Sequence, residues 1–359
     1  SFFQDHHLAR VETTPSTDKF SFSESSLIHS DNDSEYLDNQ SFTKSTLVSS
    51  FGFSGTNASL TLSPFSSVIS SSHLNVGLFP GQGRFDVDLG INQYNSSSIY
   101  RQAADSYWGH LRSILLTYSI DAPANFGERS LKIIPLFQQY ISLVHLLSLY
   151  DVSIQEGAKY DYLIGYSFGE YAASVAGSAL SFEDCIRALY EREKLVEPHR
   201  GLFFLYYIEH AQLTPALLDQ YLPKEVIVCS PSSSIYAISS TFFEQIKSSH
   251  DSNIIKFVGV DYCYHSSILI DKDCLSEAFI DIKLDFSGSN FLPSWDSSSF
   301  PSESSWTSHF VEPLRFNQLL SRLLTLSSSD VSFVEISSKS SLKRIVTQNL
   351  PLIKQYSVV

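Results

Sequence analysis

One serine of the chain lies in a pattern that would make it a nucleophile. Ser167 is the central residue of Gly165-Tyr-Ser-Phe-Gly169, which fits the spacing G-x-S-x-G. Residues 160–164 predict a short buried strand before it, and a helix rich in small residues is expected over about residues 167–177. On such a turn the serine hydroxyl projects from the sheet, and the amide of Phe168 at the helix N-terminus stabilises a negatively charged oxygen. The alternative is a glycine-containing turn that arose by chance in a serine-rich chain.

A serine nucleophile needs a general base, and His265 is the histidine that the strand pattern favours. It follows a predicted strand at residues 254–260, where the chain returns to the larger part of the molecule. The alternative is an ordinary histidine at a strand end. His145 falls within a predicted long helix and is expected to be a core residue with satisfied hydrogen bonds. The histidines in polar stretches are expected to be solvated: His6, His7, His29, His73 and His250.

The elements around these residues predict an α/β fold. A strand over Asn75–Phe79 runs into the turn Pro80-Gly-Gln-Gly83, and apolar spacing predicts a helix from Pro135 to about Tyr150. Ser181-Phe-Glu-Asp184 is typical of a helix start, with the helix over residues 185–196. The next stretch predicts a ferredoxin-like unit of the order β-α-β-β-α-β. Its predicted elements are residues 202–208, 214–221, 225–228, 235–238, 241–248 and 254–260.

Composition narrows the classes of function. The chain has 359 residues and a net charge of −14, and such an acidic chain repels nucleic-acid phosphates. The sequence shows no apolar run long enough for a membrane span and no signal-peptide pattern. Its four cysteines have no CxxC spacing, which indicates a reducing compartment and no structural zinc. We therefore expect a cytoplasmic protein that binds neither nucleic acid nor a membrane.

Six motifs, in this order, resemble the acyltransferase domain of polyketide and fatty acid synthases, the malonyl-CoA:acyl-carrier-protein transacylases. They are Phe79-Pro-Gly-Gln-Gly83, Gly165-Tyr-Ser-Phe-Gly-Glu170, Arg192, Tyr262-Cys-Tyr-His265, Trp306 with Glu312-Pro-Leu-Arg-Phe316, and Phe333-Val-Glu-Ile336. The resemblance covers roughly residues 74–359. It implies an α/β-hydrolase-like large subdomain with an inserted ferredoxin-like small subdomain, in agreement with the element order.

The resemblance also implies roles for individual residues. Ser167 is the expected nucleophile and His265 its general base, and the backbone amides of Gln82 and Phe168 are the expected oxyanion hole. His309 matches the position whose backbone carbonyl orients the catalytic imidazole in place of a triad aspartate. On composition alone, Gln82 would lie in a plain tight turn, and His309 would be a surface histidine. No metal ion and no bound cofactor are expected.

Arg192 matches the arginine that pairs with the free carboxylate of malonyl-type units in this family. A planar guanidinium binds a carboxylate through two hydrogen bonds, which selects dicarboxylic over plain acyl thioesters. The alternative is a solvated helix arginine attracted to Glu191 or Glu193. Tyr264 is also expected at the substrate, where its bulk and that of Phe168 favour a malonyl unit over a methylmalonyl unit.

Several positions depart from the family pattern, among them Arg84-Phe85 after Gly83 and Glu335-Ile-Ser-Ser338 near the end. Tyr166, expected to contact the substrate, stands where the family has a histidine, and Cys229 stands where it has an asparagine. His309 occupies a position where asparagine or glutamine is common. Because of these departures, an alternative remains: the chain is a catalytically impaired domain that acts only in docking within a larger synthase.

The N-terminal part resembles another domain of the same synthases. Val48–Ala58 is similar to the C-terminal strands of a ketosynthase or a chain-length factor. We therefore expect a ketosynthase-like remnant over residues 1–62 and a serine-rich linker over residues 63–74. The acyltransferase is then expected as residues 75–201 and 262–359, with residues 202–261 as the small subdomain.

The sequence thus predicts an acyltransferase that moves a malonyl-type unit from malonyl-CoA to the phosphopantetheine thiol of an acyl carrier protein. Its context would be polyketide or fatty acid synthesis, including synthases of polyunsaturated fatty acids, with neighbouring synthase domains as further partners. The predicted mechanism is a ping-pong transfer through an acyl-serine. The alternative function from a different class of enzyme is a serine esterase or thioesterase on the same fold. In that enzyme an acid such as Asp261 completes a catalytic triad.

Overall fold

Two compact units divide the chain, residues 1–71 and residues 72–359. The computed structural model describes residues 9–11, 46–51, 57–62, 74–82, 88–128, 135–221, 223–248, 255–270, 272–295, 306–326, 331–349 and 356–358. In the first unit, strands β1 (Ala9–Val11), β2 (Thr46–Phe51) and β3 (Asn57–Leu62) form an antiparallel sheet in the order β1-β3-β2. The residues discussed below all belong to the second unit.

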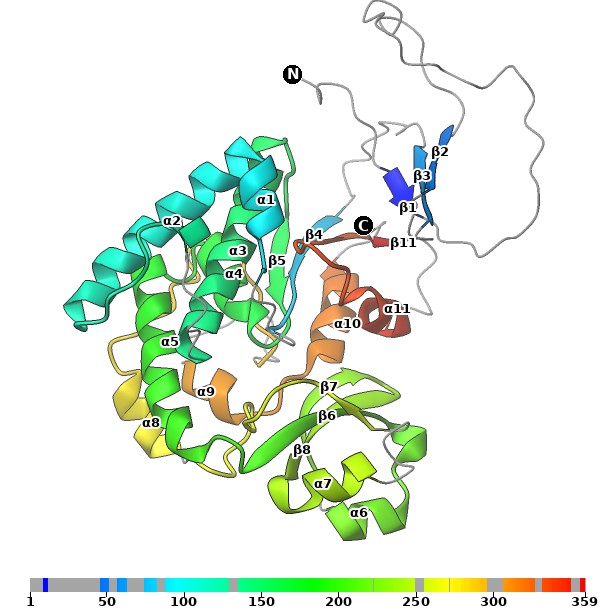
Figure 1. Ribbon diagram of the computed structural model, residues 1–359. Helices are drawn as coiled ribbons and strands as arrows, with labels where there is room; N and C mark the ends of the chain where they lie inside the picture. Colours follow the sequence, from blue (N-terminus) through cyan, green and yellow to red (C-terminus); the bar gives the residue numbers. More distant parts are fainter. Residues whose placement is uncertain are drawn as a thin grey trace, which may run out of the picture. The chain divides into compact units, whose positions relative to one another are not determined.

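A four-stranded parallel sheet lies at the centre of the second unit (Figure 1). Its order is β11 (Tyr356–Val358), β10 (Val331–Glu335), β4 (Leu74–Phe79) and β5 (Tyr162–Gly165). β4 is buried from its third residue onward, as expected for an apolar strand covered on both faces. The register sets Phe79 opposite Gly165, so the loops after β4 and β5 leave the sheet side by side.

Helices packed on the sheet supply about half of the large hydrophobic core. α3 (Pro135–Gln155) begins at the expected proline but continues one turn beyond Tyr150, because backbone hydrogen bonding continues after the apolar pattern ends. α2 (Ser98–Thr117) contacts α3 and was not predicted. Its buried residues are mostly large and apolar, and they recur at helical spacing: Tyr100, Ala103, Ala104, Trp108, Leu111, Ile114 and Leu115. The preceding short helix is α1 (Ile91–Ser96).

Two further helices carry residues of the site. α4 (Gly169–Ala176) follows β5 directly, and α5 (Phe182–Val196) begins with the predicted cap. The hydroxyl of Ser181 accepts a hydrogen bond from the Asp184 amide at 3.0 Å, which satisfies one unpaired amide of the first turn. After the small subdomain follow α8 (Lys272–Ala278), α9 (Trp306–Val311), α10 (Phe316–Leu326) and α11 (Lys343–Asn349).

The small subdomain has the predicted ferredoxin-like order of elements. It comprises β6 (Phe203–Glu209), α6 (Pro215–Tyr221), β7 (Lys224–Ser230), β8 (Ser233–Ser239), α7 (Ser240–Ser248) and β9 (Lys256–Phe257). The antiparallel strand order is β7-β8-β6-β9, and Figure 1 shows α6 and α7 on one face of this sheet. β9 is shorter than the predicted strand because Gly259 turns the chain with φ of 89°.

Candidate active site

Ser167 occupies a sharp turn between β5 and α4. Its φ is 55°, in the left-handed region, and a non-glycine residue is held there only by its surroundings. The two flanking glycines have no room for a side chain. A Cβ at Gly165 would lie 2.2 Å from the Glu170 amide nitrogen, and one at Gly169 would lie 2.1 Å from the Phe79 carbonyl oxygen. The left-handed turn also explains why α4 begins at Gly169, two residues later than expected.

The structure brings Ser167 and His265 together, although they lie 98 residues apart in sequence. The serine Oγ is 2.7 Å from His265 Nε2, and His265 Nδ1 is 2.7 Å from the backbone oxygen of His309. Because a carbonyl oxygen only accepts, the proton of the imidazole lies on Nδ1 and Nε2 is free to receive the serine proton. Burial, with His309 and Arg192 nearby, lowers the pKa of His265 well below its usual value. The imidazole is therefore neutral, as a general base must be.

The carboxylate proposed for a catalytic triad does not reach this histidine. Asp261 Oδ1 accepts a hydrogen bond from Arg200 Nη1 at 2.7 Å, and its side chain is 48% exposed. The position that a triad acid would take at His265 Nδ1 is occupied by the backbone oxygen of His309. The alternative in which Asp261 completes a triad is wrong, because its carboxylate binds Arg200 and the backbone oxygen of His309 takes its place at His265.

The His309 side chain also contacts the turn that carries Ser167. It lies on α9 and is 1% exposed, so the surface position considered for it is wrong. Its Nε2 is 3.2 Å from the backbone oxygen of Ser167 and 3.1 Å from Glu170 Oε2. Four rings surround the imidazole, each with its centroid 5.0–5.1 Å away: those of Tyr171, His265, Trp295 and Trp306. His309 thus holds the imidazole base through its backbone and the serine through its side chain.

The contact between His309 and Glu170 joins an imidazole whose pKa is lowered to a carboxyl whose pKa is raised. Burial, with Arg192 nearby, lowers the pKa of His309 to about 3. Burial also raises the pKa of the fully buried Glu170 carboxyl well above its usual value. Its Oε1 accepts a hydrogen bond from the Ser294 amide at 2.6 Å. The sequence analysis assigned no role to Glu170 or Ser294. The one sequence signal for Glu170 was its position as the last residue of the motif that contains Ser167.

Gln82 and Phe168 line the same cavity as Ser167. The Tyr166 amide donates to the Phe79 oxygen at 2.9 Å and ties the two loops together. Within the described part of the chain, neither the Gln82 amide nor the Phe168 amide donates a hydrogen bond to the protein. Both amides are therefore available for a substrate oxygen, as the expected oxyanion hole requires.

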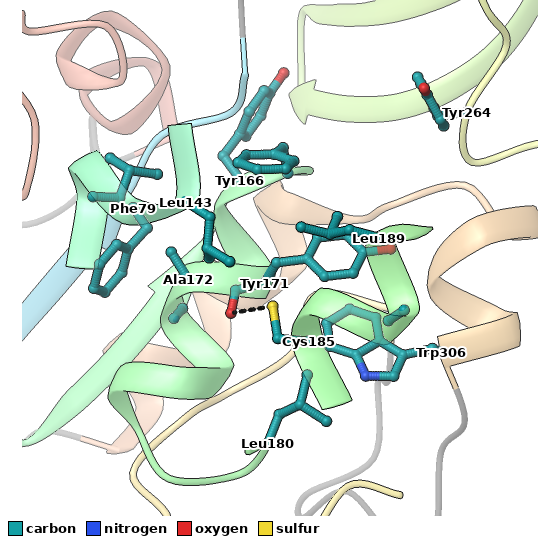
Figure 2. Close-up of a cluster of buried hydrophobic side chains, with 14 of the residues drawn as sticks. Phe79, Leu143, Tyr166, Tyr171, Ala172, Leu180, Cys185, Leu189, Tyr264 and Trp306 are labelled. Atoms are coloured by element: carbon teal, nitrogen blue, oxygen red, sulfur yellow. Dashed lines mark hydrogen bonds between the residues drawn. The ribbon is translucent and has the colours of Figure 1, made fainter. Parts of the chain in front are cut away.

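Arg192 is a buried residue of α5, and its alternative as a solvated helix arginine is wrong. Its guanidinium carbon lies 4.5 Å from the centroid of the Tyr264 ring and 5.0 Å from that of Tyr171. Figure 2 shows Tyr171 among the buried side chains beside Leu189 and Trp306, on whose indole it stacks at 4.4 Å. Among the residues that the structure describes, no carboxylate lies within 4.0 Å of Arg192.

A cavity of about 460 Å³, partly open to solvent, joins these groups. The large subdomain contributes its polar lining, namely Gln82, Ser167 and Arg192. The small subdomain contributes apolar side chains from β6, β7, β8 and the segment after β9: Leu205, Ile227, Ile235, Val258 and Val260. A guanidinium and a serine hydroxyl thus face one apolar cleft between the subdomains.

The tyrosine and the cysteine that depart from the family pattern contact each other. Tyr166 Oη lies 2.9 Å from Cys229 Sγ, and the Tyr166 ring meets the edge of Phe316 at 5.1 Å between centroids. Tyr166 precedes the nucleophile and Cys229 lies on β7, so this pair links the two subdomains beside the cavity. The two residues that depart from the family pattern are therefore hydrogen-bond partners of each other.

In the described ranges, no group of three or more histidine, cysteine, aspartate or glutamate residues is arranged to hold a metal ion. No helix there is both long and apolar enough to cross a bilayer.

Comparison with known proteins identifies the family. The profile described as "Acyl transferase domain" matches residues 77–359. The chain belongs to this acyl transferase family. Because the match begins at residue 77, the ketosynthase-like remnant over residues 1–62 stays a prediction.

Among its relatives is the "Probable polyketide synthase 22" of Dictyostelium discoideum, 23% identical over 324 residues. That alignment covers 80% of this chain but only 12% of the relative, so the acyl transferase chain spans about an eighth of that synthase.

Solved structures confirm the predicted fold class. The acyltransferase domain of the polyketide synthase PpsC of Mycobacterium tuberculosis superimposes with a TM-score of 0.65 at 18% identity, over 80% of this chain and 91% of that one. A malonyl-transacylase solved in complex with a type II polyketide synthase acyl-carrier protein gives a TM-score of 0.60 at 15% identity, over 80% and 96% of the two chains. At sequence identities this low, these comparisons show that the chains share a fold.

Proposed function

We propose that this acyltransferase transfers a malonyl-type unit from CoA to the phosphopantetheine thiol of an acyl carrier protein. The observation that supports the proposal most is Arg192, a buried cation with no carboxylate partner among the described residues, in the cavity that holds Ser167. A buried charge is costly unless it is paired, and a substrate carboxylate would supply the missing partner.

In the proposed first half-reaction, Ser167 Oγ attacks the thioester carbonyl while its proton passes to His265 Nε2. The amides of Gln82 and Phe168 hold the oxyanion, and the thiol of CoA leaves with the proton from His265. In the second half-reaction, the pantetheine thiol gives its proton to His265 and attacks the ester carbonyl. The new thioester leaves, and Ser167 recovers its proton.

The acyl unit is proposed to be malonyl rather than methylmalonyl. Tyr264 and Phe168 line the cavity beside Arg192, and both rings pack against the guanidinium that would hold the carboxylate. A branch on the carbon between carboxylate and thioester would have to fit against these rings. The carrier protein and the neighbouring synthase domains are proposed as partners because the relatives are polyketide synthases and one structural neighbour was solved with its acyl-carrier protein.

The replacement Arg192→Met tests the proposal, because methionine keeps an unbranched apolar stem against the rings but removes the charge. A hydrogen bond to a charged group contributes about 1.5–3 kcal/mol, so malonyl loading should fall about ten- to a hundredfold. Acetyl loading should change little. Arg187→Met is the matched control, since Arg187 lies on the same helix but pairs with Glu183 and Asp184 at the surface.

Loading is measured as acyl-enzyme formed from malonyl-CoA and from acetyl-CoA in separate single-turnover reactions. Equal losses with both esters would contradict the proposed role of Arg192. Rapid release of free acid by the wild type, without dependence on a carrier protein, would favour an esterase instead.

A further inference from the structure

Arg192 and Glu193 are consecutive, buried and of opposite charge, yet they do not form an ion pair. The Glu193 carboxylate has other partners. Its Oε2 accepts a hydrogen bond from Gln139 Nε2 at 2.7 Å, and its Oε1 accepts from Arg200, whose Nε lies 3.2 Å away. The negative charge beside Arg192 is therefore balanced by a second arginine.

Gln139 stands between the two charged groups. It lies on α3, is 1% exposed, and its Oε1 accepts a hydrogen bond from Arg192 Nη2 at 3.0 Å. The orientation of the amide follows from its partners, since a carbonyl oxygen cannot donate to the Glu193 carboxylate and an NH₂ group cannot accept from a guanidinium. Gln139 thus presents an acceptor to the cation and a donor to the anion, and carries no charge itself.

This arrangement leaves much of the guanidinium unused. A guanidinium has five N–H donors. In the described part of the chain, Gln139 Oε1 is the acceptor at hydrogen-bond distance from Arg192, the Tyr171 hydroxyl lies near the guanidinium, and Arg192 Nε has no partner. The rings of Tyr264, Tyr171 and Phe168 pack against the group without supplying a negative charge. The remaining N–H groups are free to bind a carboxylate from the cavity.

We infer that Gln139 is a specificity-determining positioning residue of this acyltransferase. It anchors Arg192 through a neutral acceptor and keeps Glu193 engaged elsewhere, so that the guanidinium keeps its full capacity for the carboxylate of the acyl unit. This inference rests on the proposed malonyl transfer. A carboxylate at position 139 would pair with Arg192 and compete with the substrate.

Gln139→Glu makes that change with nearly the same shape. The ratio of malonyl to acetyl loading should fall by about tenfold or more, since the new carboxylate lies within hydrogen-bond reach of the guanidinium. The loss should appear mainly as a higher KM for malonyl-CoA, while acetyl loading stays within about twofold. Gln139→Met, which removes both hydrogen bonds without adding charge, should lower the ratio by less. Gln102→Glu, at an exposed position of α2, is the matched control and should keep the wild-type ratio.

Single-turnover loading with both CoA esters and thermal unfolding of every variant complete the experiment. A wild-type ratio in Gln139→Glu, or equal loss of malonyl and acetyl loading, overturns the inference. If Gln139→Glu does not fold, Gln139→Met decides: a lowered ratio supports the inference and an unchanged ratio overturns it. If the wild type has no malonyl preference, or if Arg192→Met keeps that preference, the proposed function itself fails.

Discussion

Truncation of His309 separates its two contacts with the catalytic pair. His309→Ala removes the imidazole that bonds to the Ser167 backbone oxygen but keeps the backbone oxygen that bonds to His265 Nδ1. The base therefore stays oriented while the turn that carries the serine loses a support. His265→Ala is the comparison, because it removes the base itself.

The structure indicates how much His309→Ala should lower the unfolding free energy and the loading rate. The imidazole fills a cage of four rings, and replacement of a buried aromatic side chain by alanine costs about 3–5 kcal/mol of unfolding free energy. Loss of one neutral hydrogen bond, about 1 kcal/mol, corresponds to roughly a five- to tenfold slower loading of Ser167. Removal of the general base should cost more, about 10²–10⁴-fold. His309→Gln, which keeps a side-chain donor, should recover part of the rate lost in His309→Ala.

Urea unfolding gives the free energy of unfolding, and single-turnover formation of the acyl-enzyme gives the rate for each variant. Equal rate losses in His309→Ala and His265→Ala, with an unchanged unfolding free energy in His309→Ala, would refute the reasoning. The side chain of His309 would then take part in the chemistry rather than position the serine.

Two further results are expected. Gly169→Ala should abolish loading and lower the yield of folded protein, because the added Cβ would lie 2.1 Å from the Phe79 oxygen. Gly109→Ala, with no atom within 4 Å of the added Cβ, is the control. Equal loading rates and yields of the two variants would contradict this reason. The loading rate should stay within about twofold between pH 8 and pH 6, because the depressed pKa keeps His265 unprotonated, whereas an imidazole at the usual 6.5 would lose about three-quarters of its neutral form by pH 6. A titration of the rate with a midpoint near 6.5 would contradict the assigned environment.

Local patterns predicted the parts of the fold that depend on residues close in sequence. The turn around Ser167 was predicted because its glycines, strand and helix adjoin one another. The ferredoxin-like unit was predicted because each of its elements is short and bounded by turn residues. The helix over Ser98–Thr117 was missed although Tyr100, Ala104, Trp108, Leu111 and Leu115, all buried, recur at helical spacing, so the signal for it was present in the sequence.

The parts of the site that sequence did not reveal depend on contacts between distant segments. Gln139 lies 53 residues from Arg192 in sequence, and the Ser167 oxygen lies 142 residues from the His309 side chain that contacts it. The identity of a residue does not reveal what its backbone oxygen binds. Asp261 was therefore considered for the position at His265 that the backbone oxygen of His309 occupies. Such contacts are fixed by packing and leave no pattern of spacing.

The central claim is that Ser167 carries the acyl group, and intact-mass spectrometry after brief mixing with malonyl-CoA tests it most directly. The wild type should gain the mass of one malonyl group, located by peptide mapping on Ser167, and Ser167→Ala should gain none. The adduct should disappear when a phosphopantetheinylated carrier protein is added. A malonyl adduct of equal yield on Ser167→Ala, or one mapped to another residue of the wild type, would contradict the account.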